Sequence, residues 1–494
     1  MGRMMSARLS GLALTCTLAA CAVGPNFHHP APPPDKTYGG APSRGETAAA
    51  AGTGGNAQTF VENQDIAREW WTLFQSPSLN QLVERALKEN PNLTAAQAAL
   101  RQANELYLAQ RGSLWPQLTG GFAATRAKNA VATIANPTTY PQVNPYYNLF
   151  TADLAVSYVP DVFGGTRRAV EASKAQAESA RFQFEATYVT LTTNVVVTAI
   201  EEASLRGQIA ATERLLVLQQ TMSDIVRKQR ELGTASELDL LTQETLEAQT
   251  AATLPPLVKA LGQTRDALTA LVGRLPAEEP VETFRLEELT LPSQLPLTLP
   301  SKLVEQRPDV RQAEENLHMA SAEAGVALAE MLPQFAITGD LGSSALALNQ
   351  LFTPYTGFWS IGASLTQVLF AGGTLYHHYK AADAALDQAG AQYRAAVIQA
   401  CQNVADTLRA LGADADALKA NAAADSAAKK FFDLARQQQS LGAISLVALM
   451  NAEQAYEQAE LALVQAEANR YADTAALFQA LGGGWWNSAG GGTK

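Results

Sequence analysis

The sequence has little cysteine and histidine and no excess of positive charge. Only 3 of its 494 residues are cysteine and 5 are histidine, and 47 acidic residues outnumber 36 basic ones to give a net charge of -11. So few cysteines argue against a disulfide framework. Without a basic excess, no face would release counterions from phosphates, which argues against a nucleic-acid partner.

Long apolar runs are also missing. A membrane-spanning helix needs about 20 consecutive apolar residues. No segment reaches that length, so the sequence predicts no transmembrane helix. A short apolar run, residues 9–18, follows Arg3 and Arg8 and precedes small residues. This order is typical of a secretory signal peptide, which we assign to residues 1–20.

Cys21 comes directly after Leu18-Ala19-Ala20, a sequence similar to the lipobox of bacterial lipoproteins. In such proteins the cysteine is acylated and begins the mature chain, and a following Ala22, rather than an aspartate, favours sorting to the outer membrane. The alternative is a chance cysteine behind an ordinary cleavage site. Cys16 would be removed with the signal peptide, and Cys401 is expected to be a small packed side chain.

Two segments lack any periodicity. Residues 21–60 are rich in Pro, Gly, Ala and Thr, which predicts a lipidated, flexible tether. Gly52-Thr53-Gly54-Gly55 would cradle a phosphate only between a strand and a helix, and neither is expected there, so we interpret it as linker. Residues 484–494 are expected to form a flexible tail.

The remaining sequence repeats one unit. Landmark residues recur at nearly the same spacing in both halves, which coincidence explains poorly. We therefore predict two copies, residues 61–275 and 301–483, joined by a linker at 276–300. The landmarks are Pro91 and Pro116 with Pro308 and Pro333, each pair 25 residues apart, Gly233 and Gly273 with Gly442 and Gly482, each pair 40 apart, and Phe163-Gly164-Gly165-Thr166 with Phe370-Ala371-Gly372-Gly373-Thr374.

Each copy is expected to contain a short helix, two strands and then a very long helical hairpin. Apolar residues from Leu375 to Ala400 recur in alternating steps of four and three, the 3.5-residue repeat of a coiled coil. A helix from Thr374 to Leu441 would be roughly 100 Å long at 1.5 Å per residue. Glycine readily adopts the left-handed conformation that ends a helix, so Gly233 and Gly442 are predicted to mark the hairpin ends.

Apolar and polar residues alternate in four segments, residues 118–122, 150–158, 335–342 and 359–365. Alternation over about ten residues suits a transmembrane barrel strand, apolar toward lipid and polar toward the lumen. It also suits a half-buried soluble sheet. Four strands cannot close a barrel, and an open edge in lipid would leave backbone groups unpaired. Closure would therefore have to come from other chains.

These features together resemble the TolC-like outer membrane factors, in particular the NodT branch of resistance-nodulation-division (RND) efflux lipoproteins. The resemblance runs from Cys21 to about Gly484. Its most specific signature begins at Arg307 and also suits helix initiation by a first-turn Pro308 beside Asp309. The signatures are Arg307-Pro308-Asp309-Val310-Arg311-Gln312-Ala313-Glu314, Cys21-Ala22-Val23-Gly24-Pro25-Asn26, Glu69-Trp70-Trp71, Val162-Phe163-Gly164 and Leu295-Pro296.

The resemblance implies a mixed α and β fold: a homotrimeric 12-strand transmembrane β-barrel, with four strands per chain, continued by a long antiparallel coiled-coil α-helical barrel. It also implies a passive, gated conduit that receives small molecules from a periplasmic adaptor protein and an inner-membrane RND-type pump. The adaptor would dock at the hairpin ends, here called tip 1 and tip 2. Tip 1 consists of Gly233, Thr234, Ala235 and Ser236, and tip 2 of Gly442, Ala443, Ile444 and Ser445.

The gate of this chain is expected to differ from that of many relatives, which carry an acidic residue six or nine positions after the tip 2 glycine. These positions here are Ala448 and Asn451. A ring of three carboxylates about 6 Å apart would repel by roughly 0.7 kcal/mol per pair in water. Its absence should ease closure. Alternatively, Asp239 or Glu237, behind tip 1, supplies the charge.

No group of residues indicates catalysis, a metal site or a cofactor, so we expect no enzyme. The pairs Glu201-Glu202 and Glu314-Glu315 are expected to lie on solvated helix faces rather than to form an acid/base pair. His318, His377 and His378 lack ligand spacing to carboxylates or cysteines.

The same features allow three alternatives to an efflux duct: the duct of a type I-like secretion system, a structural envelope lipoprotein, and a diffusion porin. Amphipathic strands argue against a purely structural spacer. A porin carries all its strands in one chain, which argues against the third alternative.

Overall fold

A computed structural model describes residues 22–35, 37–39, 45–130, 144–280 and 282–487. The predicted signal peptide and Cys21 lie outside these residues. The chain divides into two units. The sheet unit comprises residues 1–29, 101–179 and 314–392, and the hairpin unit comprises residues 30–100, 180–313 and 393–494.

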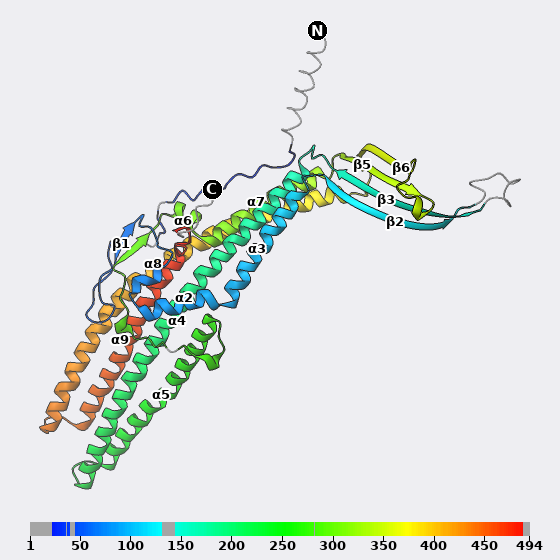
Figure 1. Ribbon diagram of the computed structural model, residues 1–494. Helices are drawn as coiled ribbons and strands as arrows, with labels where there is room; N and C mark the ends of the chain where they lie inside the picture. Colours follow the sequence, from blue (N-terminus) through cyan, green and yellow to red (C-terminus); the bar gives the residue numbers. More distant parts are fainter. Residues whose placement is uncertain (1–21, 36, 40–44, 131–143, 281, 488–494) are drawn as a thin grey trace. The chain divides into compact units, whose positions relative to one another are not determined.

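The sheet unit contains one antiparallel sheet of four strands in the order β2-β3-β5-β6 (Figure 1). Both pairs of predicted strands are present, but each strand is longer than its alternating segment suggested. Within the described part of the chain, β2 and β6 each have a neighbour on one side only. The strands are β2 (Gln117–Lys128), β3 (Tyr146–Tyr158), β5 (Gln334–Ala345) and β6 (Gly357–Thr366).

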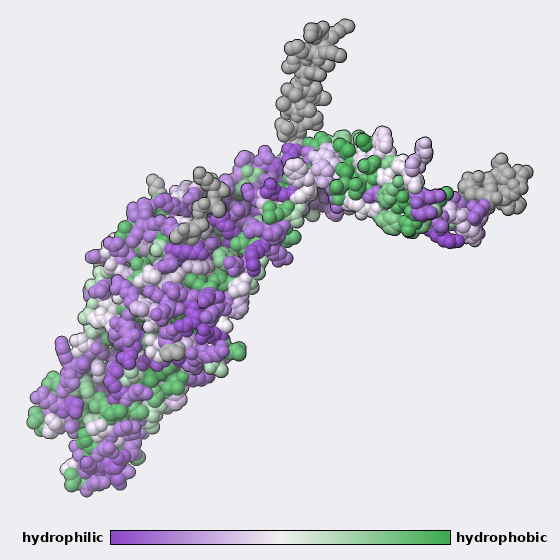
Figure 2. Space-filling view, in the orientation of Figure 1, coloured by the Kyte–Doolittle hydropathy of each residue, from purple (hydrophilic) through white to green (hydrophobic). Residues whose placement is uncertain are grey.

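The sheet has an apolar face and a polar face, as the alternation predicted. Leu154 is paired with Leu341, and Leu341 with Trp359, so all three lie on one face. Their exposed fractions are 51%, 62% and 73%. On the opposite face, the Ser360 hydroxyl donates a hydrogen bond to Asp340 Oδ2 at 3.0 Å. Figure 2 shows hydrophobic residues gathered over the strands on the side in view.

The helices reproduce the predicted repeat. α3 (Pro91–Gly112) and α7 (Pro308–Ala329) both have 22 residues. α4 (Gly165–Glu231) and α8 (Thr374–Ser440) both have 67, about 100 Å at 1.5 Å per residue. Each long helix is followed, after its tip, by a returning helix, α5 (Glu237–Val272) or α9 (Leu446–Ala480). We call α4 and α5 hairpin 1, and α8 and α9 hairpin 2. Among the described residues, none of these helices combines the length and apolar character needed to cross a membrane.

The hairpin unit also contains elements that the sequence did not reveal. β1 (Thr59–Glu62) pairs in parallel with β4 (Gln294–Leu297), inside the segment expected to be a linker. The short helices are η1 (Trp70–Phe74), α2 (Pro77–Glu89) and α6 (Pro300–Gln306). Four residues per strand are too few for an alternation pattern to be distinguished, which explains why this sheet was missed.

The supposed tether is held in place where the structure describes it. The buried Arg470 guanidinium donates hydrogen bonds to Thr47 Oγ1 at 2.9 Å and to the Asn56 carbonyl at 2.7 Å. The fully buried Gln58 donates to the Pro292 carbonyl at 3.0 Å. Between these residues, a Cβ atom placed on Gly54 would lie 3.0 Å from Tyr471 Cε2, so the segment also packs closely against a distant side chain. The interpretation of residues 52–55 as a flexible linker is therefore wrong, because distant side chains hold a segment that has no periodicity of its own.

The start of the supposed tail is fixed in the same way. The Trp485 indole N–H donates to the Gln306 carbonyl at 2.6 Å, and the Trp486 indole N–H donates to Asp65 Oδ1 at 3.0 Å. Residues 488–494 of the predicted tail lie outside the described part of the chain. The predicted flexibility is wrong for residues 484–487, where each of two indole N–H groups finds a hydrogen-bond acceptor distant in the sequence.

Candidate functional sites: the hairpin tips and the junction of strands and helices

The two tips have the same backbone turn. At tip 1, Gly233 N–H donates to the Arg230 carbonyl at 2.9 Å and Thr234 N–H to the Gln229 carbonyl at 2.8 Å. At tip 2, the N–H groups of Gly442 and Ala443 donate to the equivalent carbonyls, both at 2.9 Å. This is the pattern of a Schellman motif, which requires a left-handed residue. The φ angles of +74° and +69° at the two glycines meet that requirement.

Tip 1 is closed by polar and charged side chains. Ser236 and Asp239 form a reciprocal capping box at the start of α5: Asp239 N–H donates to Ser236 Oγ at 3.1 Å, and Ser236 N–H donates to Asp239 Oδ2 at 2.9 Å. Ser236 donates to the Asp239 carboxyl from its backbone N–H and also from its hydroxyl, at 2.7 Å, and these two bonds hold the pKa of Asp239 below its usual value. Glu237 forms an ion pair with Arg230 across the tip. Both candidate gate acids of hairpin 1 therefore have partners within the tip.

Tip 2 has only half of this arrangement. Ser445 accepts a hydrogen bond from Ala448 N–H at 3.2 Å, but Ala448 occupies the position of Asp239 and has no carboxylate to return the bond. Asn451 lies one helical turn further along α9 and is exposed. The two gate positions predicted on hairpin 2 thus carry no charge.

Ile444 differs from its prediction as an exposed tip residue. It is half-buried and packs against a hydrophobic cluster formed by residues of α4, α8 and α9. Its equivalent in tip 1, Ala235, is also half-buried. The other six tip residues are exposed. The cluster consists of Met222, Phe432, Ala435, Leu449 and Ala452.

A buried acid lies directly behind this cluster. Glu453 is 1% exposed, and its Oε1 has no hydrogen-bond partner among the described residues. Burial, together with the nearby Glu457, raises the pKa of Glu453 to about 7. Its equivalent on hairpin 1, Glu244, is 41% exposed and forms an ion pair with Arg227 at 3.1 Å. The same residue type therefore lies inside one hairpin and on the surface of the other.

Other acids and one histidine also differ from their predictions. Glu202 is fully buried and forms ion pairs with Arg206 and Arg265, both at 2.7 Å, and Glu314 and Glu315 are buried as well. The interpretation of these pairs as solvated helix faces is wrong for these three residues. For Glu202, one of the two partners, Arg265, lies 63 residues away in the sequence, which no local pattern reveals.

The His318 ring lies between two carboxylates, one from its own helix, α7, and one from α4. Its ring lies 3.0 Å from Glu171 Oε1 and 3.4 Å from Glu315 Oε2, and it stacks on Phe27. Hydrogen bonds to Glu315 raise the pKa of His318, although burial opposes them, and Glu171 adds to the increase. Within the described ranges, no group of three or more His, Cys, Asp or Glu residues is arranged to hold a metal ion.

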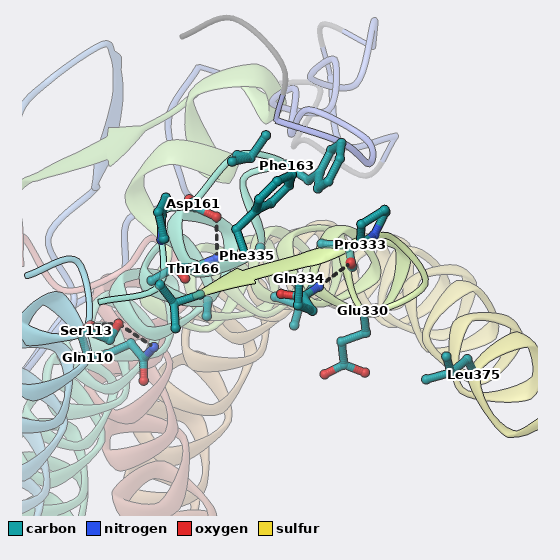
Figure 3. A pocket seen from close by; sticks show the side chains of 17 residues that line it. Gln110, Ser113, Asp161, Phe163, Thr166, Glu330, Pro333, Gln334, Phe335 and Leu375 are labelled. Carbon is teal, nitrogen blue, oxygen red and sulfur yellow. Dashed lines mark hydrogen bonds between the residues drawn. The ribbon is translucent and has the colours of Figure 1, made fainter. Parts of the chain in front are cut away.

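A cavity of about 440 Å³ lies in the sheet unit where strands pass into helices (Figure 3). The rings of Phe163 and Phe335 lie on one side of it, with centroids 6.4 Å apart. Asp161 accepts hydrogen bonds from the Thr166 and Arg167 N–H groups at 3.0 and 2.9 Å and so caps the start of α4. These contacts fix the turn that joins β3 to α4.

A model of the outer membrane efflux protein family matches residues 82–274 and 299–483. The chain belongs to this family. It is 26% identical over 486 residues to the probable efflux pump outer membrane protein SepC of Pseudomonas putida, covering 98% of each chain. It is 28% identical over 477 residues to the pyoverdine export outer membrane protein OpmQ of Pseudomonas putida, covering 96% of this chain and 97% of the relative.

Solved structures agree with this assignment. The outer-membrane channel OprN is 26% identical, with a TM-score of 0.81 over 94% of this chain and all of OprN. The CmeC channel of Campylobacter jejuni, 22% identical with a TM-score of 0.82, covers 95% of this chain and 96% of CmeC and supports the fold alone. The family resemblance and fold class predicted from the sequence are confirmed. The protein is the outer-membrane channel component of an efflux system.

Proposed function

We propose that this chain forms, as a homotrimer, the exit duct of a tripartite pump for small molecules such as drugs and other toxic compounds. Two observations together carry the proposal: the sheet has two open strand edges, and two tips with the same backbone turn lie at the ends of 67-residue helices. The sheet edges call for further chains, and the tips offer a repeated docking feature. Transport energy would come from an inner-membrane RND-type transporter, reached through a periplasmic adaptor.

A single chain cannot complete the sheet. Among the residues that the structure describes, the outward N–H and C=O groups of β2 and β6 have no strand partner, and in lipid each unsatisfied group costs several kcal/mol. Three copies of a four-stranded sheet would supply 12 strands in a closed ring, an even number in the range of bacterial outer-membrane barrels. The apolar face of Leu154, Leu341 and Trp359 would then face lipid.

The names of relatives support a small-molecule cargo. They include a toluene efflux protein and a pyoverdine export protein of Pseudomonas putida. A type I-like secretion duct is the second candidate, since a passive conduit takes its specificity from the pump to which it is joined.

Drug sensitivity of deletion strains tests the function. We expect loss of this protein to sensitise cells to toxic compounds, and loss of its pump in the same background to add nothing. A strain that lacks both should be no more sensitive than either single deletion. Additive sensitisation, or a defect confined to a secreted protein, would contradict an efflux duct for small molecules.

Lipidation of Cys21 is part of the same proposal. We expect radiolabelled palmitate on the natural protein and none on Cys21→Ser, which should still export its cargo but be less firmly anchored. Equal labelling of the two proteins would refute it.

A further inference from the structure

The apolar face of the sheet contains a hollow. Gly120 lies opposite Leu154, and Leu154 lies opposite Leu341, so these residues belong to the face that carries Trp359. Together with Phe122 they line a cavity of about 750 Å³. Because Gly120 has no side chain, it leaves room between the larger apolar residues around it.

The loop that joins β5 to β6, residues 346–356, folds back over the same face. Phe352 N–H donates a hydrogen bond to Ser343 Oγ at 3.2 Å, and the Ser343 hydroxyl donates to Thr356 Oγ1 at 2.7 Å. Ser343 lies two residues from Leu341 and therefore projects from the apolar face. Phe352 is 75% exposed and also lines the cavity. The hollow therefore has apolar sides and lies on the outside of the sheet.

Two basic residues project from this face beyond the apolar ones. Arg126 and Lys128 follow Phe122 at even spacing along β2, so they share its face. Both are exposed, and the four described strands contain no other basic residue. In a chain of net charge -11, this face therefore carries a local positive charge at one end of its apolar band.

The neighbours of the basic pair do not neutralise it. Arg126 lies opposite Asn148, and Lys128 lies opposite Tyr146, with its Nζ 5.5 Å from the centroid of the tyrosine ring. The acid of β3, Asp153, projects from the opposite face. Tyrosine rings and basic side chains at the edge of an apolar surface are typical of a membrane interface.

The spacing of hollow and basic pair matches the depth of one leaflet. Arg126 lies six residues beyond Gly120, about 20 Å along a strand at 3.4 Å per residue. At a strand tilt of about 45°, this is about 14 Å of depth, close to half of a hydrocarbon core of about 30 Å. β2 and β3 extend beyond β5 at the end remote from α3 and α4 (Figure 1). With the helices in the periplasm, that end lies in the outer leaflet.

We propose that the hollow and the basic pair together bind a phosphorylated, acylated glycolipid of the outer leaflet, the chemical class of lipid A. One acyl chain occupies the hollow beside Phe122. Arg126 and Lys128 bind the phosphate oxygens, to which an arginine donates two parallel hydrogen bonds. The inference rests on the membrane-embedded duct proposed above and adds a ligand of its outer surface.

Native mass spectrometry of the full-length, detergent-extracted protein tests the proposal without any variant. The probes are diphosphoryl lipid A, the same lipid without its phosphates, and inorganic phosphate. We expect diphosphoryl lipid A to bind at least about tenfold more tightly than the dephosphorylated lipid, and excess inorganic phosphate not to displace it. Equal affinity for the two lipids would overturn the phosphate site, and displacement by inorganic phosphate would overturn the role of the hollow.

Loss of the basic pair should remove the preference for phosphate. Since each basic residue near an anionic lipid surface contributes about fivefold in affinity, Arg126→Gln with Lys128→Gln should weaken binding of diphosphoryl lipid A roughly 25-fold and leave the dephosphorylated lipid unchanged. The matched control adds Thr125→Arg and Ala127→Lys to that variant, which places the same charges on the opposite face of β2. Recovery of binding by this control would overturn the site, because positive charge at the strand end would then be sufficient.

Gly120→Phe fills the hollow. A Cβ atom placed on Gly120 would lie 3.5 Å from Leu154 Cδ2, an ordinary contact, so the strand accommodates a side chain there. We expect at least about tenfold weaker binding of diphosphoryl lipid A, whereas Thr119→Phe, on the opposite face, should bind it normally. Unchanged binding by Gly120→Phe would overturn the acyl-chain site. Trimers that bind no lipid A would overturn this inference and leave the efflux duct intact, and a natural protein that is monomeric would overturn both.

Discussion

The two hairpins end in the same turn but fix it with different side chains. At tip 1, Ser236 and Asp239 form a capping box. Further along α5, Glu244 lies at the surface beside Arg227. At tip 2, Ala448 replaces the capping acid, and the equivalent acid, Glu453, is buried. At these equivalent positions hairpin 1 therefore exposes its acid and hairpin 2 buries it. The two copies of the repeat thus share the backbone turn of the tip but differ in the side chains that cap it and in the burial of the acid that follows.

The largest effect should come from adding charge to the hairpin that lacks it. We expect Asn451→Asp to increase block by a trivalent cation at least about tenfold, because each carboxylate about 6 Å away attracts such an ion by roughly 2 kcal/mol even in water. The measurement is single-channel conductance in a planar bilayer, with the cation added on the periplasmic side. The natural protein should be blocked weakly.

Thr242→Asp is the matched control, since Thr242 occupies the position of Asn451 on hairpin 1. If hairpin 2 forms the narrowest point, this control should change block much less than Asn451→Asp. Strong block of the natural protein that is abolished only by Asp239→Asn would place the gate on hairpin 1 instead.

The second effect should come from replacing the glycine in the turn that both tips share. A β-branched residue at Gly442 or Gly233 would be strained by about 1–2 kcal/mol in the left-handed conformation, although no other atom lies within 4 Å of the position of a new Cβ. We expect Gly442→Val to weaken crosslinking to the adaptor and leave the trimer intact. Gly442→Asn, which tolerates this conformation, should retain crosslinking. Comparison with Gly233→Val shows which tip the adaptor requires.

The local sequence pattern was enough to predict the long helices, the four long strands and the positions of the two tips. Alternation marks the strands, the 3.5-residue repeat marks the long helices, and Gly233 and Gly442 mark their ends because each needs a positive φ. The contacts that were missed depend on residues far apart in the sequence. Arg470 reaches Thr47, and Glu202 reaches Arg265, across separations that no periodicity encodes. Burial of Ile444 and Glu453 likewise depends on the neighbouring hairpin.

The buried acid of hairpin 2 should make stability depend on pH. Because the pKa of Glu453 is about 7 in the folded chain and ordinarily 4.5, the folded state keeps a proton that the unfolded state loses. Stability from this group therefore falls as pH rises from 4.5 to 7 and is level above that range. We expect Glu453→Gln to raise the free energy of unfolding by on the order of 1–2 kcal/mol near pH 8 and to change it little at pH 4.5.

Thermal unfolding followed by circular dichroism at the two pH values measures this difference. Glu244→Gln is the matched control: this equivalent acid is 41% exposed and paired with Arg227, so its loss should cost no more than about 0.5 kcal/mol. A Glu453→Gln variant whose stability follows the natural protein at both pH values would show that the acid does not carry the expected penalty.

The smallest expected effect is a difference in stability between loss of the serine cap of α5 and loss of the serine cap of α9. Ser236→Ala removes both hydrogen bonds of the capping box side chain, the one accepted from Asp239 N–H and the one donated to Asp239 Oδ2 at 2.7 Å. Ser445→Ala removes only the bond accepted from Ala448 N–H. Since loss of a serine cap costs about 0.5–2 kcal/mol, we expect Ser236→Ala near 1 kcal/mol or above and Ser445→Ala toward the lower limit. Hydrogen exchange of the amides that begin α5 and α9 measures each opening free energy separately.

Restoring the acid with Ala448→Asp should strengthen tip 2, so that loss of Ser445 in that background costs as much as loss of Ser236. Equal costs for the two serines without the added acid would mean that the capping box does not distinguish the tips.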